Sequence, residues 1–77
     1  MNDFIRFEML DRPADRKTDI WIVYPRSGSA QLGEVKFFGA WRKFCFFPGA
    51  AMIFDCSCLR DIAEFCEQVT NAWRKAA

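Results

Sequence analysis

Residues 32–48 read LGEVKFFGAWRKFCFFP, and this stretch decides the fold. Apolar Val35 and Phe37 alternate with charged residues, the period of two that gives a strand one buried face and one wet face. A Gly-Ala dipeptide then separates two aromatic runs, and a Pro-Gly dipeptide ends the second. The stretch therefore predicts a β-hairpin with strands over 31–38 and 41–47 and a two-residue turn between them.

The rest of the N-terminal half predicts further strands and a connection. Residues 20–24 are β-branched and aromatic, a composition that strands favour, and 4–10 alternate loosely between apolar and charged, which suits a short edge strand. The segment 11–19 is charged, contains Pro and has no apolar period, so we expect a mobile connection. A last short strand is expected at 52–54.

The C-terminal third has the period of a helix. Ser57 is the expected N-cap, Asp61 and Glu64 lie early, and Arg74-Lys75 fall in the last turn, where cations oppose the helix dipole. Apolar residues at spacings of three and four form a stripe that should face the sheet: Leu59, Ile62, Cys66, Val69 and Trp73, widened by Phe65. Such a helix is not stable alone, so it must pack on the sheet.

These elements predict an α+β fold: an antiparallel sheet of three or four strands packed by one C-terminal helix. We expect 1–77 to be a single domain, with 1–19 an N-terminal segment and 20–77 the sheet and helix. A chain of 77 residues buries only about 60% of its unfolded surface. Nine Phe, three Trp and a hydrophobic fraction of 52% supply the dense core that this size requires.

Charge and hydropathy narrow the function classes. The net charge of +1 gives no global attraction to nucleic acid or an anionic membrane. Residues 20–48 nevertheless carry four basic residues against Glu34 alone. No apolar run has the length of a signal-peptide core or a membrane span, so the expectation is a cytoplasmic protein with no membrane partner.

The reactive residues predict neither catalysis nor a cofactor. Without His the chain lacks the usual general base, and the carboxylates of Asp61, Glu64 and Glu67 have the spacing of a solvated helix face. Zinc sites generally use paired Cys or His ligands at wider spacing than Cys56-x-Cys58. We expect no metal, no cofactor and reduced thiols that act as small hydrophobes: Cys45, Cys56, Cys58 and Cys66.

One basic and aromatic group is the candidate binding site: Arg26, Lys36, Phe38, Trp41, Arg42 and Lys43. Aromatic rings that stack on bases and cations that meet phosphates suit a nucleic-acid-binding sheet. The alternative is that the rings fill the core while the cations solubilise the outer face. A third interpretation makes Trp41 and Arg42 an interface anchor for a protein, since both residue types are enriched in binding hot spots.

Three motifs carry a resemblance over about two thirds of the chain: LGEV at 32–35, FGAWRKFCFFP at 38–48 and CLRDIAEF at 58–65. With them, residues 21–69 resemble a group of small phage and prophage proteins. The resemblance implies an origin in a mobile element and action in the cytoplasm of a bacterial host, but it implies no activity and assigns no functional residues. The order of strands and helix is also similar to the integrase arm-binding domain, an analogy of fold alone.

Two classes of function therefore compete. The first is a non-catalytic protein-binding module, whose sharpest form is an anti-CRISPR-like inhibitor that binds a host protein or nucleoprotein complex in host defence. The second is a small DNA-binding or transcription-accessory domain that uses the basic and aromatic hairpin. The sequence leaves the partner and the oligomeric state open.

Overall fold

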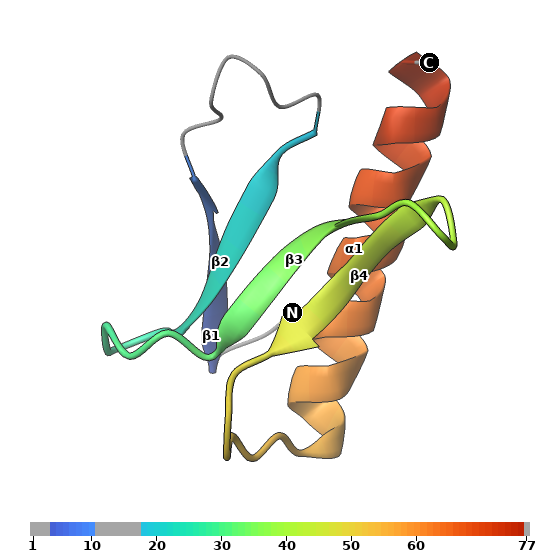
Figure 1. Ribbon diagram of the computed structural model, residues 1–77. Coiled ribbons are helices and arrows are strands. Elements are labelled where there is room, and N and C mark those ends of the chain that lie inside the picture. The colour runs from blue at the N-terminus through green and yellow to red at the C-terminus, as the bar shows by residue number, and fades with distance from the viewer. Residues whose placement is uncertain (1–3, 11–17, 77) are drawn as a thin grey trace.

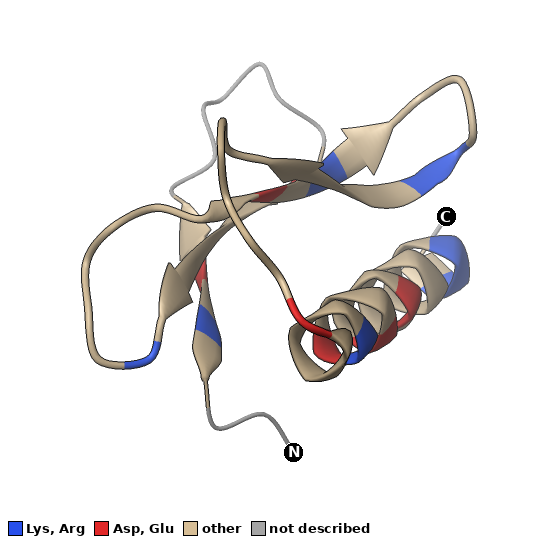
Figure 2. Ribbon diagram, turned by 90° about the horizontal axis from the view of Figure 1, so that it is seen from below, with Lys and Arg blue, Asp and Glu red and all other residues tan. Residues whose placement is uncertain are grey.

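The chain folds into one four-stranded sheet and one helix. The computed structural model describes residues 4–10 and 18–76. Its elements are β1 (Ile5–Leu10), β2 (Ile20–Pro25), β3 (Gly33–Phe38), β4 (Lys43–Pro48) and α1 (Cys56–Ala76). All neighbours are antiparallel in the order β1-β2-β3-β4, and α1 lies against one face beside β4 (Figures 1 and 2). The predicted α+β fold is confirmed; most of the connection expected at 11–19 lies outside the described residues.

The alternation of side chains separates a helix face from an open face. Val23 and Val35, each 0% exposed, point toward α1 and form the centre of the core. Rings from three strands surround them: Phe7 stacks on Phe65 of α1 at 4.0 Å, while Trp21 meets Phe44 edge-on at 5.7 Å. Residues one position away along each strand lie on the open face, the side of the sheet that α1 does not cover. The predicted alternation in β3 is therefore correct.

The helix begins two residues earlier than a Ser57 cap would place it. Asp55 is the N-cap, because its carboxylate oxygen Oδ1 accepts the backbone N–H of Cys58 at 2.9 Å, and its carbonyl accepts the N–H of Leu59. The hydrogen bond from Cys58 lowers the pKa of Asp55 below its ordinary value. With this start, the first turn of α1 contains no acidic residue, whereas Arg74 and Lys75 occupy its last turn as expected.

The apolar stripe of α1 is shifted at its first turn. Ile62 is buried, and four other members of the predicted stripe pack against the core: Phe65, Cys66, Val69 and Trp73. Leu59 is 50% exposed, so its predicted place against the sheet is wrong. Cys58 packs there instead, four residues before Ile62, which keeps it on the same side of the helix.

The strand expected at 52–54 is also wrong. This segment is an extended connection without strand pairing, and its Ile53 is 95% exposed. Ala51 just before it has a φ of 58°, a left-handed conformation that bends the chain away from β4. The connection still contributes to packing, because the ring of Phe54 meets the ring of Phe46 edge-on at 5.3 Å.

A buried hydroxyl joins α1 to the edge of the sheet. β4 is the last strand in the order, so alternate N–H groups along it have no neighbouring strand to accept them. The N–H of Phe44 donates to Oγ1 of Thr70 at 2.9 Å, and Thr70 is only 7% exposed. The helix therefore supplies the acceptor that a fifth strand would otherwise provide.

Replacing Thr70 should separate this hydrogen bond from simple packing. Thr70→Val keeps the shape but leaves the buried N–H of Phe44 without an acceptor, which we expect to cost about 1–3 kcal/mol of unfolding free energy. Thr70→Ser keeps the hydroxyl and should cost less. Chemical denaturation measures both; a larger loss in Thr70→Ser than in Thr70→Val would mean that the methyl group, not the hydroxyl, is what matters.

Gly33 makes room for an aromatic ring. A Cβ at Gly33 would lie 2.6 Å from the ring of Phe46 and 2.7 Å from the carbonyl oxygen of Phe47. Because one of these neighbours is backbone, the clash cannot be relieved by a side-chain rotation alone. The first residue of β3 is therefore restricted to glycine by the close approach of β4.

Two glycine substitutions form a matched pair. Gly33→Ala should destabilise the fold by about 1–3 kcal/mol through overpacking. Gly39→Ala should be neutral or stabilising by about 0.4–1 kcal/mol, because a Cβ there meets nothing within 4 Å and Gly39 does not have a positive φ. Thermal denaturation of the two variants tests the difference; similar melting temperatures would contradict the packing described at Gly33.

Candidate functional site

The hairpin between β3 and β4 has a longer turn than predicted. Phe38 pairs with Lys43, so Gly39 to Arg42 form a four-residue loop, closed by hydrogen bonds from Trp41 N to Phe38 O and from Arg42 N to Gly39 O, both 3.2 Å. A two-residue type I′ turn needs a positive φ at both central residues, which suits Asn-Gly and disfavours Ala. The prediction that Trp41 and Arg42 belong to the strand is therefore wrong.

Arg42 has the one unfavourable backbone conformation of the described residues in this loop. Its φ of 53° lies in the left-handed region, where a side chain with a Cβ costs roughly 1–2 kcal/mol. The guanidinium turns toward the helix and lies 5.7 Å from the ring centre of Trp73. Arg42 thus connects the hairpin loop to the helix through its contact with Trp73.

Three rings on the open side of the hairpin form a contiguous aromatic surface. Phe38 meets Trp41 edge-on with ring centres 5.0 Å apart, and meets Phe47 with ring centres 6.2 Å apart. Trp41 is 64% exposed, although it is one of the largest apolar side chains in the chain. We call Phe38, Trp41 and Phe47, with Lys36 beside them, the hairpin surface.

The hairpin surface borders a pocket of about 230 Å³. Its walls are Phe38, Trp41 and Phe47, and atoms of Cys45 and Phe46 complete it. The lining is almost entirely apolar, so the pocket fits an apolar side chain better than a polar one. Strand pairing places Phe38 and Phe47, and the loop between the strands adds Trp41.

The basic candidates do not gather into one patch. Lys36 lies 3.5 Å from the carboxylate of Glu34, with its Nζ 4.6 Å from the ring centre of Phe47. Lys43 is exposed at the start of β4. Arg26 lies in the loop that precedes β3, at the opposite end of that strand from the hairpin. Of the six residues singled out by sequence, Phe38, Trp41 and Lys36 therefore come together, and Arg26 does not belong to the site.

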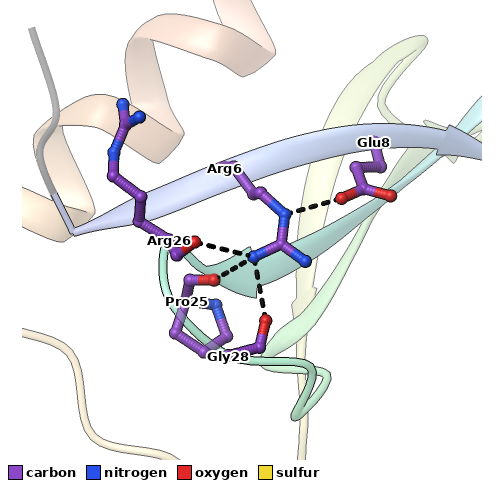
Figure 3. Close-up of polar contacts among 5 residues, drawn as sticks. All are labelled: Arg6, Glu8, Pro25, Arg26 and Gly28. Atoms are coloured by element: carbon purple, nitrogen blue, oxygen red, sulfur yellow. Dashed lines mark hydrogen bonds and ion pairs between the residues drawn. The ribbon is translucent and has the colours of Figure 1, made fainter.

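Sequence reasoning missed Phe47 and Arg6. Phe47 shares a face with Lys43 at a spacing of four in β4, so strict alternation could have placed it on the open side. The Arg6 guanidinium donates to the carbonyls of Pro25, Arg26 and Gly28, and its Nε lies 2.6 Å from Glu8 (Figure 3). Its Cζ also lies 4.8 Å from the ring centre of Tyr24. These contacts tie the β2–β3 connection to β1.

A second hollow of about 260 Å³ lies between β4 and α1. Phe44, Thr70 and Cys66 line its inner part, and Glu67 and Arg74 line its outer part. Burial raises the pKa of the Cys66 thiol to about 11, so the thiol is protonated at neutral pH and is a poor nucleophile. Among residues 4–10 and 18–76, no group of three or more His, Cys, Asp or Glu side chains could hold a metal ion.

The comparisons with known proteins add no relative: no family model, curated protein or solved structure matches this chain. In the part of the chain that the structure describes, no helix is both long enough and apolar enough to cross a membrane.

Thiol reactivity should follow the burial of the four free cysteines. Cys56 is exposed and should be alkylated first, while Cys66 should stay slow at pH 8 and react faster as the pH approaches its raised pKa of about 11. Peptide mapping after timed alkylation of the folded protein measures the order. A Cys66 that reacts as fast as Cys56 at pH 8 would contradict the buried position described for it.

Proposed function

We propose that the chain is a non-catalytic protein-binding module that docks through the hairpin surface. The observation that carries the proposal is Trp41, an indole side chain 64% exposed at the wall of an apolar pocket. Trp is among the residues most enriched in interface hot spots, which cluster in well-packed pockets. A rigid hairpin loses little conformational entropy when it binds, and this raises the affinity per contact.

The chemistry of the surface suggests what a partner presents. Phe38, Trp41 and Phe47 favour an apolar side chain at the centre. Lys43 pairs with Phe38 across the hairpin and is exposed, so a carboxylate at the rim of the partner would meet this cation. Lys36, beside Phe47, already has Glu34 as its partner. The fitting partner is a protein segment with an apolar anchor flanked by acidic residues.

The sharper form of the proposal is inhibition of a host defence complex, as an anti-CRISPR protein does, in the cytoplasm of a bacterial host. Its support is the resemblance of residues 32–48 and 58–65 to small phage and prophage proteins. A compact chain with one exposed anchor is suited to blocking a surface by occupying it. A non-catalytic mode agrees with the protonated thiol of Cys66 and with the lack of His.

Nucleic-acid binding is the second candidate, favoured by one observation. Phe38 and Phe47 lie on the open face of an antiparallel sheet with Lys36, an arrangement in which rings can stack on unpaired bases. The charges support it less: Lys36 is paired with Glu34, and Arg42 is directed toward Trp73. With Arg26 at the other end of β3, few cations remain to neutralise phosphates.

Two exposed apolar residues give a matched test of the docking surface. The tagged chain is used to capture its partner from bacterial lysate, and the affinity of the purified pair is then measured for two variants. Trp41→Ala should weaken binding by about thirtyfold or more, the equivalent of a hot spot of about 2 kcal/mol. Ile53→Ala removes a side chain that is 95% exposed elsewhere and should leave the affinity unchanged.

The same purified chain is titrated with single-stranded and duplex DNA at low and physiological salt. We expect no binding at physiological salt. Micromolar affinity for DNA that falls steeply with salt and is lost in Arg42→Glu/Lys43→Glu, with no protein partner recovered, would favour the second candidate instead. Equal affinity of Trp41→Ala and wild type for a recovered protein would remove the hairpin surface from the interface.

A further inference from the structure

The two edges of the sheet differ in how they are protected. At β4, the N–H of Phe44 is bonded to Thr70, Pro48 has no N–H, and α1 lies alongside in both views (Figures 1 and 2). β1 forms the opposite edge. Its six residues pair one to one with β2, without a bulge, and include neither Lys nor Pro. Among the described residues, β1 therefore has none of three devices that often prevent an edge strand from pairing with another chain: Lys, Pro and a bulge.

A hydrogen bond at the start of β1 shows which backbone groups point outward. The N–H of Arg26 donates to the carbonyl of Phe4 at 2.9 Å, so these two residues form a hydrogen-bonded pair of the ladder. Antiparallel pairs alternate, so every second residue after Phe4 directs its N–H and C=O toward β2. The intervening residues direct theirs away from the sheet: Ile5, Phe7 and Met9. Pro25, which has no N–H to give, is the partner of Ile5 and agrees with this phase.

Only one central register lets this edge pair with itself. In a symmetric antiparallel pair with a second β1, the outward residues of one strand must lie opposite the outward residues of the other. Near the middle of the strand this leaves three positions for the two-fold axis: at Arg6, at Phe7 or at Glu8. The first choice opposes Arg6 to Arg6, and the third opposes Glu8 to Glu8; like charges directly opposite are destabilising. The axis at Phe7 instead opposes each Arg6 to a Glu8.

We propose that β1 is a dimerisation edge that pairs with β1 of a second copy, antiparallel and centred on Phe7. Phe7 of each copy bonds reciprocally with Phe7 of the other, and Ile5 of each faces Met9 of the other. This pairing covers Met9, which is 62% exposed in the single chain. The two sheets join into one, and the hairpin surfaces lie on strands remote from the shared edge.

The charges at this edge are already arranged for the pairing. Within one chain, Arg6 and Glu8 lie on the same face, 2.6 Å apart (Figure 3). The carbonyls of the β2–β3 connection also hold the Arg6 guanidinium, which limits its freedom before association. In the dimer each Glu8 lies between the Arg6 of its own chain and that of the other, and the four charges alternate in sign.

Sedimentation equilibrium of the full chain over a range of concentrations tests the proposal. The mass should rise from 9.0 kDa toward twice that value. Glu8→Arg should keep the chain monomeric where wild type is dimeric, because only cations then meet across the axis. Met9→Pro should do the same, since it removes an outward N–H and spares the ladder with β2. Glu67→Arg, an equal charge change on α1, should dimerise as wild type does.

A charge exchange identifies the register. A Glu8→Arg chain and an Arg6→Glu chain should each remain monomeric, yet should form a mixed dimer when combined, because every opposed pair then joins opposite charges. If Arg6→Glu does not fold, Met9→Pro and Glu8→Arg decide the matter alone. A wild-type chain that stays at 9.0 kDa at every concentration would overturn the proposal. A dimer that persists in both Met9→Pro and Glu8→Arg would also overturn it. Neither result bears on Trp41, so failure here leaves the proposed docking function standing.

Discussion

The hydrogen bond from the N–H of Phe44 to the hydroxyl of Thr70 ties α1 to one edge of the sheet. A helix with one apolar stripe must pack on a sheet, but apolar packing alone does not fix where along the sheet it lies. A buried donor on an edge strand has only one acceptable solution, an acceptor at hydrogen-bond distance. Thr70 provides it, so α1 is held beside β4, and the helix face of the sheet is closed from that edge inward.

Fixing α1 beside β4 determines what the hairpin exposes. Trp73 lies next to the end of the hairpin, where it meets Phe37 at 4.6 Å and has the Arg42 guanidinium 5.7 Å from its ring. Arg42 has a positive φ at this point of the loop. The same loop conformation leaves Trp41 on the other side, against Phe38. The loop therefore has Arg42 beside the helix and an exposed indole beside Phe38.

The sequence predicted those features that depend on period and missed those that depend on a single contact. The alternation in residues 33–38 and the helical stripe through Ile62 are readable from the sequence, because each element buries one apolar face. The turn length depends on one torsion at Arg42. The helix start depends on whether Asp55 caps the N–H of Cys58, as it does, or Ser57 caps an N–H two or three residues after itself. Thr70 has the pattern of a surface residue, because its role exists only once β4 is known to be an edge.

The candidate site divides along the same line. Phe38 and Lys36 were predicted as members of a basic and aromatic group, and they lie together on the open face. Arg26 was grouped with them by charge, yet charge carries no information about which end of a strand a loop follows. Phe47 was overlooked because every residue in 44–47 is apolar, so the sequence does not show which of them face the helix. Phe44 and Phe46 point to the helix, while Phe47 points away.

A sheet this small has only two edges, and one helix can protect only one of them. Because Thr70 commits α1 to β4, β1 keeps its outward backbone groups at the far side of the sheet. Met9, on the helix face of β1, is 62% exposed, as expected where α1 lies beside the other edge. The same hydrogen bond that closes one edge and orients the hairpin therefore leaves the other edge with the geometry and the alternating charges that a second copy would recognise.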